Sequence, residues 1–111
     1  MATLQERLDE FRLLSFEVQK AKMILMLTEL KDSDQVFVDL LDIVKNNTEI
    51  NSDFLVGAYH DIMDFAQAIE NHDKHRALHQ LSVMQMRIQK IRDAEAADRA
   101  KENPEDILNQ M

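Results

Sequence analysis

Glycine and proline are almost absent from this chain, which has one of each among 111 residues and contains neither cysteine nor tryptophan. The turns of a β-sandwich or β-barrel need many more glycines and prolines, which argues against an all-β fold. Because Gly57 is the lone glycine, the glycine-rich loops that bind dinucleotides and nucleoside triphosphates are excluded as well. The lack of cysteine rules out disulfides, thiolate metal sites, iron–sulfur clusters and cysteine nucleophiles.

Long hydrophobic runs are also missing. No apolar stretch approaches the roughly 18 residues that a membrane span needs, and residues 1–6 lack the basic and apolar regions of a signal peptide. We therefore expect no membrane partner and a cytoplasmic location. The mass of 13.0 kDa suits one domain over residues 1–111, and 45% apolar residues suffice for a hydrophobic core.

Charge is distributed unevenly along the chain, whose formal net charge is −8. Residues 32–73 contain ten acidic residues and a single base, Lys45, whereas residues 74–103 carry an excess of bases. We expect these two segments to attract each other, within one chain or between chains. The basic segment still contains four acidic residues, so it lacks the concentrated positive face that a nucleic-acid partner requires.

The spacing of apolar residues predicts an all-α fold, an antiparallel up-and-down bundle of four helices plus a short C-terminal helix. Thr3 followed by Glu6 has the spacing of a capping box and predicts where the first helix begins. The loops between helices are only a few residues long, which favours up-and-down connections. The predicted helices cover residues 3–31, 33–46, 52–71, 74–102 and 104–110.

Regular apolar seams identify the expected core. In the predicted third helix the seam is Leu55, Ala58, Tyr59, Ile62, Ala66 and Ile69, and in the fourth it is Ala77, Leu81, Met84, Ile88 and Ile91. Gly57 lies inside the third helix, where it either admits a close helix crossing or is tolerated. The alanine-rich stretch 93–102 either extends past the bundle or packs closely through its alanines.

Surplus apolar residues point to association. The predicted first helix is apolar on two faces, so it either lies at the centre of the fold or meets a partner. The seven methionines suit an adaptable binding surface, with gap-filling in the core as the alternative. The candidate interface residues are Leu13, Phe16, Met23, Leu27, Val83 and Met86.

These features predict a function only as a class: a small acidic helical protein–protein interaction module, an adaptor or regulatory subunit rather than an enzyme, with no cofactor. The predicted first and fourth helices are longer than the two between them, and their overhanging ends would pair in a two-fold, coiled-coil-like homodimer. The expected partner is therefore a second copy or another helical protein.

Histidines support an alternative function, a metal- or pH-responsive helical bundle. His72, His75 and His79 are spaced by three and four residues, so they share a face if one helix continues through them. The spacing of His75 and His79 suits two imidazole ligands of a transition metal, although exposed helix histidines are more often only solvated. His60 and Asp64 have the spacing of a base and its orienting carboxylate, but the sequence sets no nucleophile beside them.

Overall fold

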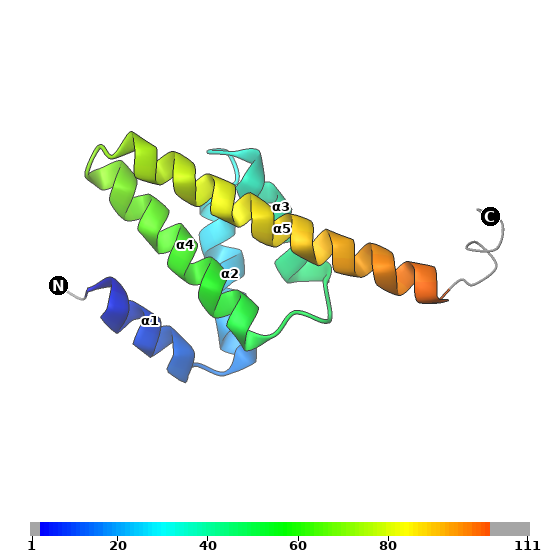
Figure 1. The fold of residues 1–111 in the computed structure, drawn as a ribbon. Helices are drawn as coiled ribbons and strands as arrows, with labels where there is room; N and C mark the ends of the chain where they lie inside the picture. The colour runs from blue at the N-terminus through cyan, green and yellow to red at the C-terminus, as the bar shows by residue number, and fades with distance from the viewer. Residues whose placement is uncertain (1–2, 103–111) are drawn as a thin grey trace.

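The computed structural model describes residues 3–102 and confirms an all-α fold (Figure 1). Five helices make up this part of the chain, which contains no strand. Their bounds are α1 Leu4–Leu13, α2 Phe16–Leu30, α3 Gln35–Asn46, α4 Ser52–Glu70 and α5 Lys74–Glu102. The predicted helix over residues 104–110 lies outside the described residues.

The single helix predicted over residues 3–31 is wrong, because the chain turns between α1 and α2. Leu14 has an extended backbone, and the hydroxyl of Ser15 accepts a hydrogen bond from the Val18 N–H at 3.3 Å as the N-cap of α2. Gln19 is buried, and its Nε2 donates to the Phe11 carbonyl at 2.9 Å. These bonds satisfy backbone groups that the break would otherwise leave without partners.

The other helix ends agree with the predicted bounds to within two residues, and side-chain caps fix where each helix begins. The Thr3 hydroxyl accepts from the Glu6 N–H at 3.1 Å, at the start predicted for the first helix. The carboxylate of Asp34 caps α3, and the amide oxygen of Asn51 caps α4. Asp73 accepts from the Arg76 N–H at 3.1 Å and starts α5. Such caps are local signals, which is why the sequence carries them.

Helices α4 and α5 form a hairpin, and the other helices pack around it (Figure 1). Helix α1 lies along the side of α4 away from α5, and α2 crosses behind α4 in this view. Helix α3 contacts both α2 and α5. The bundle therefore contains five helices in residues 3–102 where four were predicted, because the first predicted helix is two.

The core is continuous across all five helices. Its largest fully buried side chains include Phe11, Phe37 and Leu40, and the ring of Phe11 stacks on Tyr59 with centroids 4.3 Å apart. Helix α2 is contacted by α3 on one side and by α4 on another, which explains why its sequence is apolar on more than one face. For α2, the first of the two interpretations, a position at the centre of the fold, is confirmed.

The second half of α5 extends beyond the other helices toward the C-terminus (Figure 1). Its inner face is still attached at Glu95, whose carboxylate accepts a hydrogen bond from Asn47 Nδ2 at 2.8 Å. The alanine-rich stretch is thus held on one side and extends outward beyond that point. None of the helices in residues 3–102 has the length and apolar character needed to cross a membrane.

Candidate functional site

Ion pairs join the acidic and basic segments within one chain, as their charges predict. Asp61 and Asp64 on α4 are buried, and both carboxylates face α5. Arg87 Nε donates to Asp61 Oδ2 at 2.5 Å, and Arg76 pairs with Asp64, which also accepts from Gln80 Nε2 at 2.6 Å. Further along, Arg92 lies 3.4 Å from Asp39 on α3. Asp61 and Asp64 therefore link α4 to α5, while Asp39 links α3 to α5.

Gly57 makes room for one of these pairs. The guanidinium of Arg87 lies directly over it, so an added Cβ would be 2.7 Å from Arg87 Nη1. The glycine admits a close side-chain contact from α5, whereas one of its two expected roles was a close helix crossing. The contact is with a long side chain rather than with the neighbouring backbone.

The pairing of His60 with Asp64 does not form. Asp64 is occupied by Arg76 and Gln80, and His60 Nδ1 lies instead 3.1 Å from Asp61 Oδ1. The Asp61 carboxylate also accepts a hydrogen bond from Arg87 Nε, so it forms an ion pair between α4 and α5. Asp61 and Asp64 thus make contacts that stabilise the packing of α4 against α5, and His60 and Asp64 do not form the predicted base–carboxylate pair.

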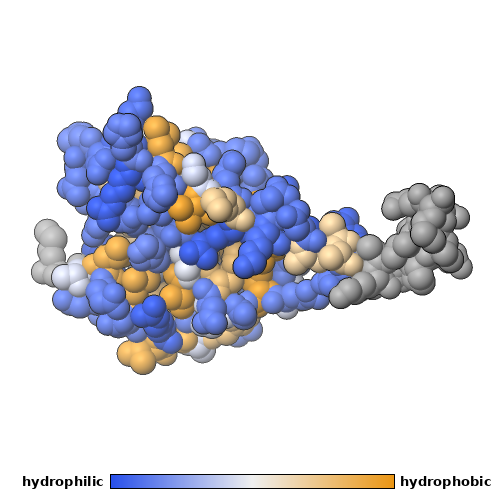
Figure 2. Space-filling view, in the orientation of Figure 1, coloured by the Kyte–Doolittle hydropathy of each residue, from blue (hydrophilic) through white to orange (hydrophobic). Residues whose placement is uncertain are grey.

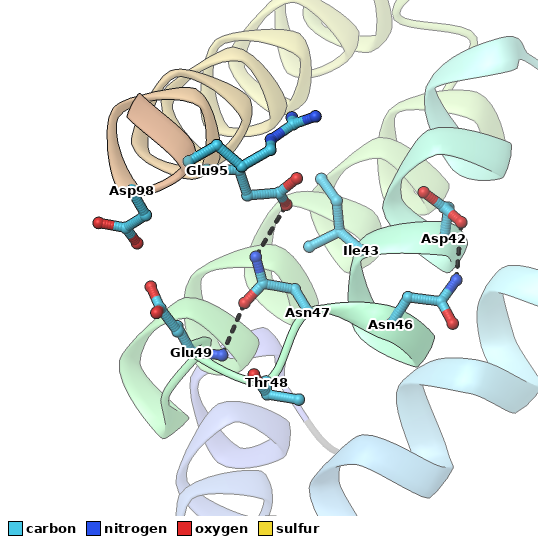
Figure 3. Close-up of a pocket in the computed structure, with 9 residues that line it drawn as sticks. Asp42, Ile43, Asn46, Asn47, Thr48, Glu49, Glu95 and Asp98 are labelled. Carbon is cyan, nitrogen blue, oxygen red and sulfur yellow. Dashed lines mark hydrogen bonds between the residues drawn. The ribbon is translucent and has the colours of Figure 1, made fainter. Parts of the chain in front are cut away.

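A polar cleft of about 290 Å³ lies where the end of α3, the following loop and the outer part of α5 meet (Figure 3). Asn47 spans it, donating to Glu95 and accepting from the Glu49 N–H at 2.8 Å. Asp42 accepts from Asn46 at 2.8 Å on the side away from α5. The bond between Asn47 and Glu95 thus attaches the loop to α5, while the other two bonds lie within α3 and within the loop. Within residues 3–102, no three His, Cys, Asp or Glu side chains form a group that could hold a metal ion.

An apolar groove lies at the turn between α4 and α5 and is the strongest candidate for a binding surface. Its volume is about 460 Å³. Two of its side chains, Ile69 and Leu78, are 55% and 52% exposed. In Figure 2, apolar areas lie among hydrophilic side chains at several places on this face of the molecule, and one of them lies over the first half of α5. The groove is lined by Phe65, Ala68, Ile69, His72, Asp73, Lys74, Ala77, Leu78 and Leu81.

The turn beneath the groove explains its shape. His72 has a positive φ of 56°, a conformation that ends many helices. The N–H groups of His72 and Asp73 donate back to Ile69 and Ala68, at 3.1 and 2.8 Å. Helix α5 therefore starts almost at once beside the end of α4. The last residues of α4, from Phe65, and the first two turns of α5, to Leu81, form the two walls of the groove.

The predicted interface residues do not form one surface. Met23 and Leu27 are fully buried in the core, so the interface prediction is wrong for these two, because α3 and α4 cover α2 from two sides. Phe16 and Val83 are partly buried. Leu13 is 87% exposed and Met86 is 71% exposed, but Leu13 ends α1 while Met86 lies on α5, with α4 between these helices in Figure 1.

The predicted histidine set does not assemble either. His72 lies in the turn and lines the groove, whereas His75 and His79 lie on α5, which begins only at Lys74. The three imidazoles therefore do not share one helix, and they are not part of any group that could hold a metal in the described region. The proposed ligand set of His72, His75 and His79 is wrong as a set.

Sequence reasoning missed the groove for an identifiable reason. Ile69 continues the seam of the predicted third helix, which places it in the core, but Ala66 and Ile69 at the end of that seam are exposed while Ala68 is fully buried, so α5 covers a different face of α4 there. Leu78 stands outside the seam of the fourth helix, and this apolar residue off the seam was the available signal. Comparison with protein-family models, with curated proteins and with solved structures finds no match to this chain.

Proposed function

We propose that this chain is a helical protein–protein interaction module, an adaptor or regulatory subunit, that binds one amphipathic helix of its partner in the groove at the α4–α5 turn. The observation that carries the proposal is the exposure of Ile69 and Leu78 beside the further apolar side chains that line the groove. Exposed apolar patches of this kind on a soluble surface commonly mark sites of association.

A helix is the partner element that fits best. Two adjacent helices leave a furrow between their side-chain ridges, into which the ridge of a third helix packs. A groove of about 460 Å³ has room for a few aliphatic side chains from one turn or two of such a helix. The polar rim, which includes Asp73 and Lys74, would fix the orientation of the bound helix.

The test uses a fluorescent peptide helix with leucines at positions i, i+3, i+4 and i+7 and glutamate and alanine elsewhere. A scrambled peptide of the same composition serves as the control ligand. We expect the ordered peptide to bind more tightly in an anisotropy titration. Leu78→Glu places a charge in the groove and should weaken binding at least about tenfold, since burying a charge against apolar groups is costly.

Met86→Glu is the matched control variant. Met86 is an exposed apolar residue on the same helix and lies outside the groove, so its replacement should leave binding unchanged. Equal binding of the ordered and scrambled peptides, or equal loss in Leu78→Glu and Met86→Glu, would contradict the proposal. Circular dichroism of both variants checks that the helices are intact.

A further inference from the structure

We infer that the occupant of the groove is the segment 103–111 of a second copy of this chain, so that two copies exchange these segments and form a dimer. The inference rests on the proposed function, because it names the partner for the same groove. It is carried by the chemistry of the groove, by the sequence of the segment and by the distance between the two.

The segment has the apolar and charged residues that the groove requires. Asn103, Pro104 and the acids after them have the order of residues that starts a helix. In a helix, Met111 falls on the same face as Ile107 and Leu108, because it follows them by four and by three residues.

Charge favours the same pairing. Glu105 and Asp106 precede the apolar face of the segment, and the rim of the groove carries Lys74 and His72. Asp73 in the lining accepts the Arg76 N–H as the cap of α5 and keeps its negative charge, so Lys74 is the group of the rim that attracts the acids of the segment. A segment with two acids beside three apolar residues is therefore complementary to an apolar groove with a lysine at its edge.

The distance excludes docking within one chain. Leu81 is the groove residue that lies furthest along α5, and from there to Glu102 the helix spans about 32 Å at about 1.5 Å per residue. Leu108 follows Glu102 by six residues, so even full extension carries it only about 20 Å. Ile107 and Leu108 thus cannot enter the groove of their own chain, and a second copy must supply it.

The projecting end of α5 makes an exchange between copies geometrically simple (Figure 1). The groove lies at the start of α5 and the segment follows its end. Two copies with antiparallel α5 helices therefore place each segment at the groove of the other. Both contacts are then equivalent, and the assembly closes with two-fold symmetry.

Cysteine crosslinking tests the pairing directly, since the chain contains no cysteine of its own. A tagged chain with Lys74→Cys is mixed with an untagged chain carrying Asn109→Cys, and a short bismaleimide is added. We expect a crosslinked product of one tagged and one untagged chain. Arg12→Cys replaces Lys74→Cys in the control, because Arg12 adjoins the exposed Leu13, the rival apolar end of the molecule.

The inference requires three further results. Adding Ile107→Glu to the Asn109→Cys chain should abolish the crosslink, and full-length Ile107→Glu should have half the wild-type mass by light scattering. The variant Lys74→Cys with Asn109→Cys in one chain should give dimers and no internally linked monomer. Equal yields at Arg12 and Lys74, an internal crosslink, or a wild-type mass of 13.0 kDa would each overturn the exchange.

The peptide titration distinguishes failure of the exchange from failure of the proposed function. If the ordered peptide binds in a Leu78-dependent manner while the crosslink is absent, only the exchange is overturned. If neither peptide binding nor the crosslink is found, the groove is not a binding surface and both proposals fall.

Discussion

Replacing Gly57 by alanine should change the stability of the protein in two opposite ways, through helix propensity and through a clash with Arg87. Glycine inside a helix costs about 1 kcal/mol relative to alanine, so on helix propensity alone Gly57→Ala would stabilise the protein. The new methyl group would lie 2.7 Å from Arg87 Nη1 and 2.9 Å from its Cζ, well inside ordinary contact. Arg87 must therefore move away, and it is the residue that neutralises the buried Asp61.

How far Arg87 and Asp61 are exposed to solvent determines how much stability is lost when their ion pair is disturbed. Exposed ion pairs contribute about 0–1 kcal/mol, whereas removing one partner of a buried pair costs about 3–5 kcal/mol. The side chain of Asp61 is 4% exposed and that of Arg87 is 36% exposed. Full loss of this pair would cost about 2 kcal/mol. Because only the far end of the flexible Arg87 side chain must shift, this is the upper limit of the opposing effect, and Gly57→Ala should destabilise the protein by at most about 1 kcal/mol, close to 4 °C in Tm for a chain of this size.

The decisive measurement repeats the substitution in a background of Arg87→Ala. With the guanidinium gone, the three nearest atoms to the methyl group are removed, and Gly57→Ala should stabilise the protein by about 1 kcal/mol. Urea unfolding followed by circular dichroism gives all four free energies of unfolding in one cycle. The same effect of Gly57→Ala in both backgrounds would refute the reasoning, because the contact between Gly57 and Arg87 would then have no energetic consequence.

Three other expectations follow from the packing. Burial raises the pKa of Tyr59 above its ordinary value near 10, with Arg7 opposing and Glu10 reinforcing the shift. Its contribution to stability is complete below pH 10 and is lost as the pH rises through the folded pKa. Tyr59 is the only tyrosine, so absorbance at 295 nm follows it alone, and a midpoint at or below 10 would contradict the burial. Leu27→Ala should cost about 2–5 kcal/mol because Leu27 is fully buried, whereas Leu25→Ala, at an exposed site on the same helix, should change stability by less than about 0.5 kcal/mol in urea titrations. Melting curves with zinc and with a chelator should coincide, and a zinc-dependent rise in Tm would reveal a metal site that the histidine positions do not explain.

Local signals in the sequence predict the fold class and most of the helix ends. Scarce glycine and proline and the apolar periodicity indicate helices, and caps such as Thr3 and Asp73 mark their first residues. These signals act between residues no more than four apart, so they can be read without knowing the fold. The opposite charges of residues 32–73 and 74–103 also predicted an attraction, because net charge depends only on composition.

Tertiary structure decided which apolar faces are covered and where the first helix breaks. Met23 and Leu27 look like a second, surplus face until α3 and α4 are known to pack on both sides of α2. The break at Ser15 is stabilised by Gln19, which also accepts a hydrogen bond from the Ser52 hydroxyl at 2.9 Å, 33 residues away. Burial depends on which distant segments pack together, and periodicity along one helix does not contain that information. For the same reason Ile69 continues a core seam in the sequence but lies at the surface of the folded chain, where the groove begins.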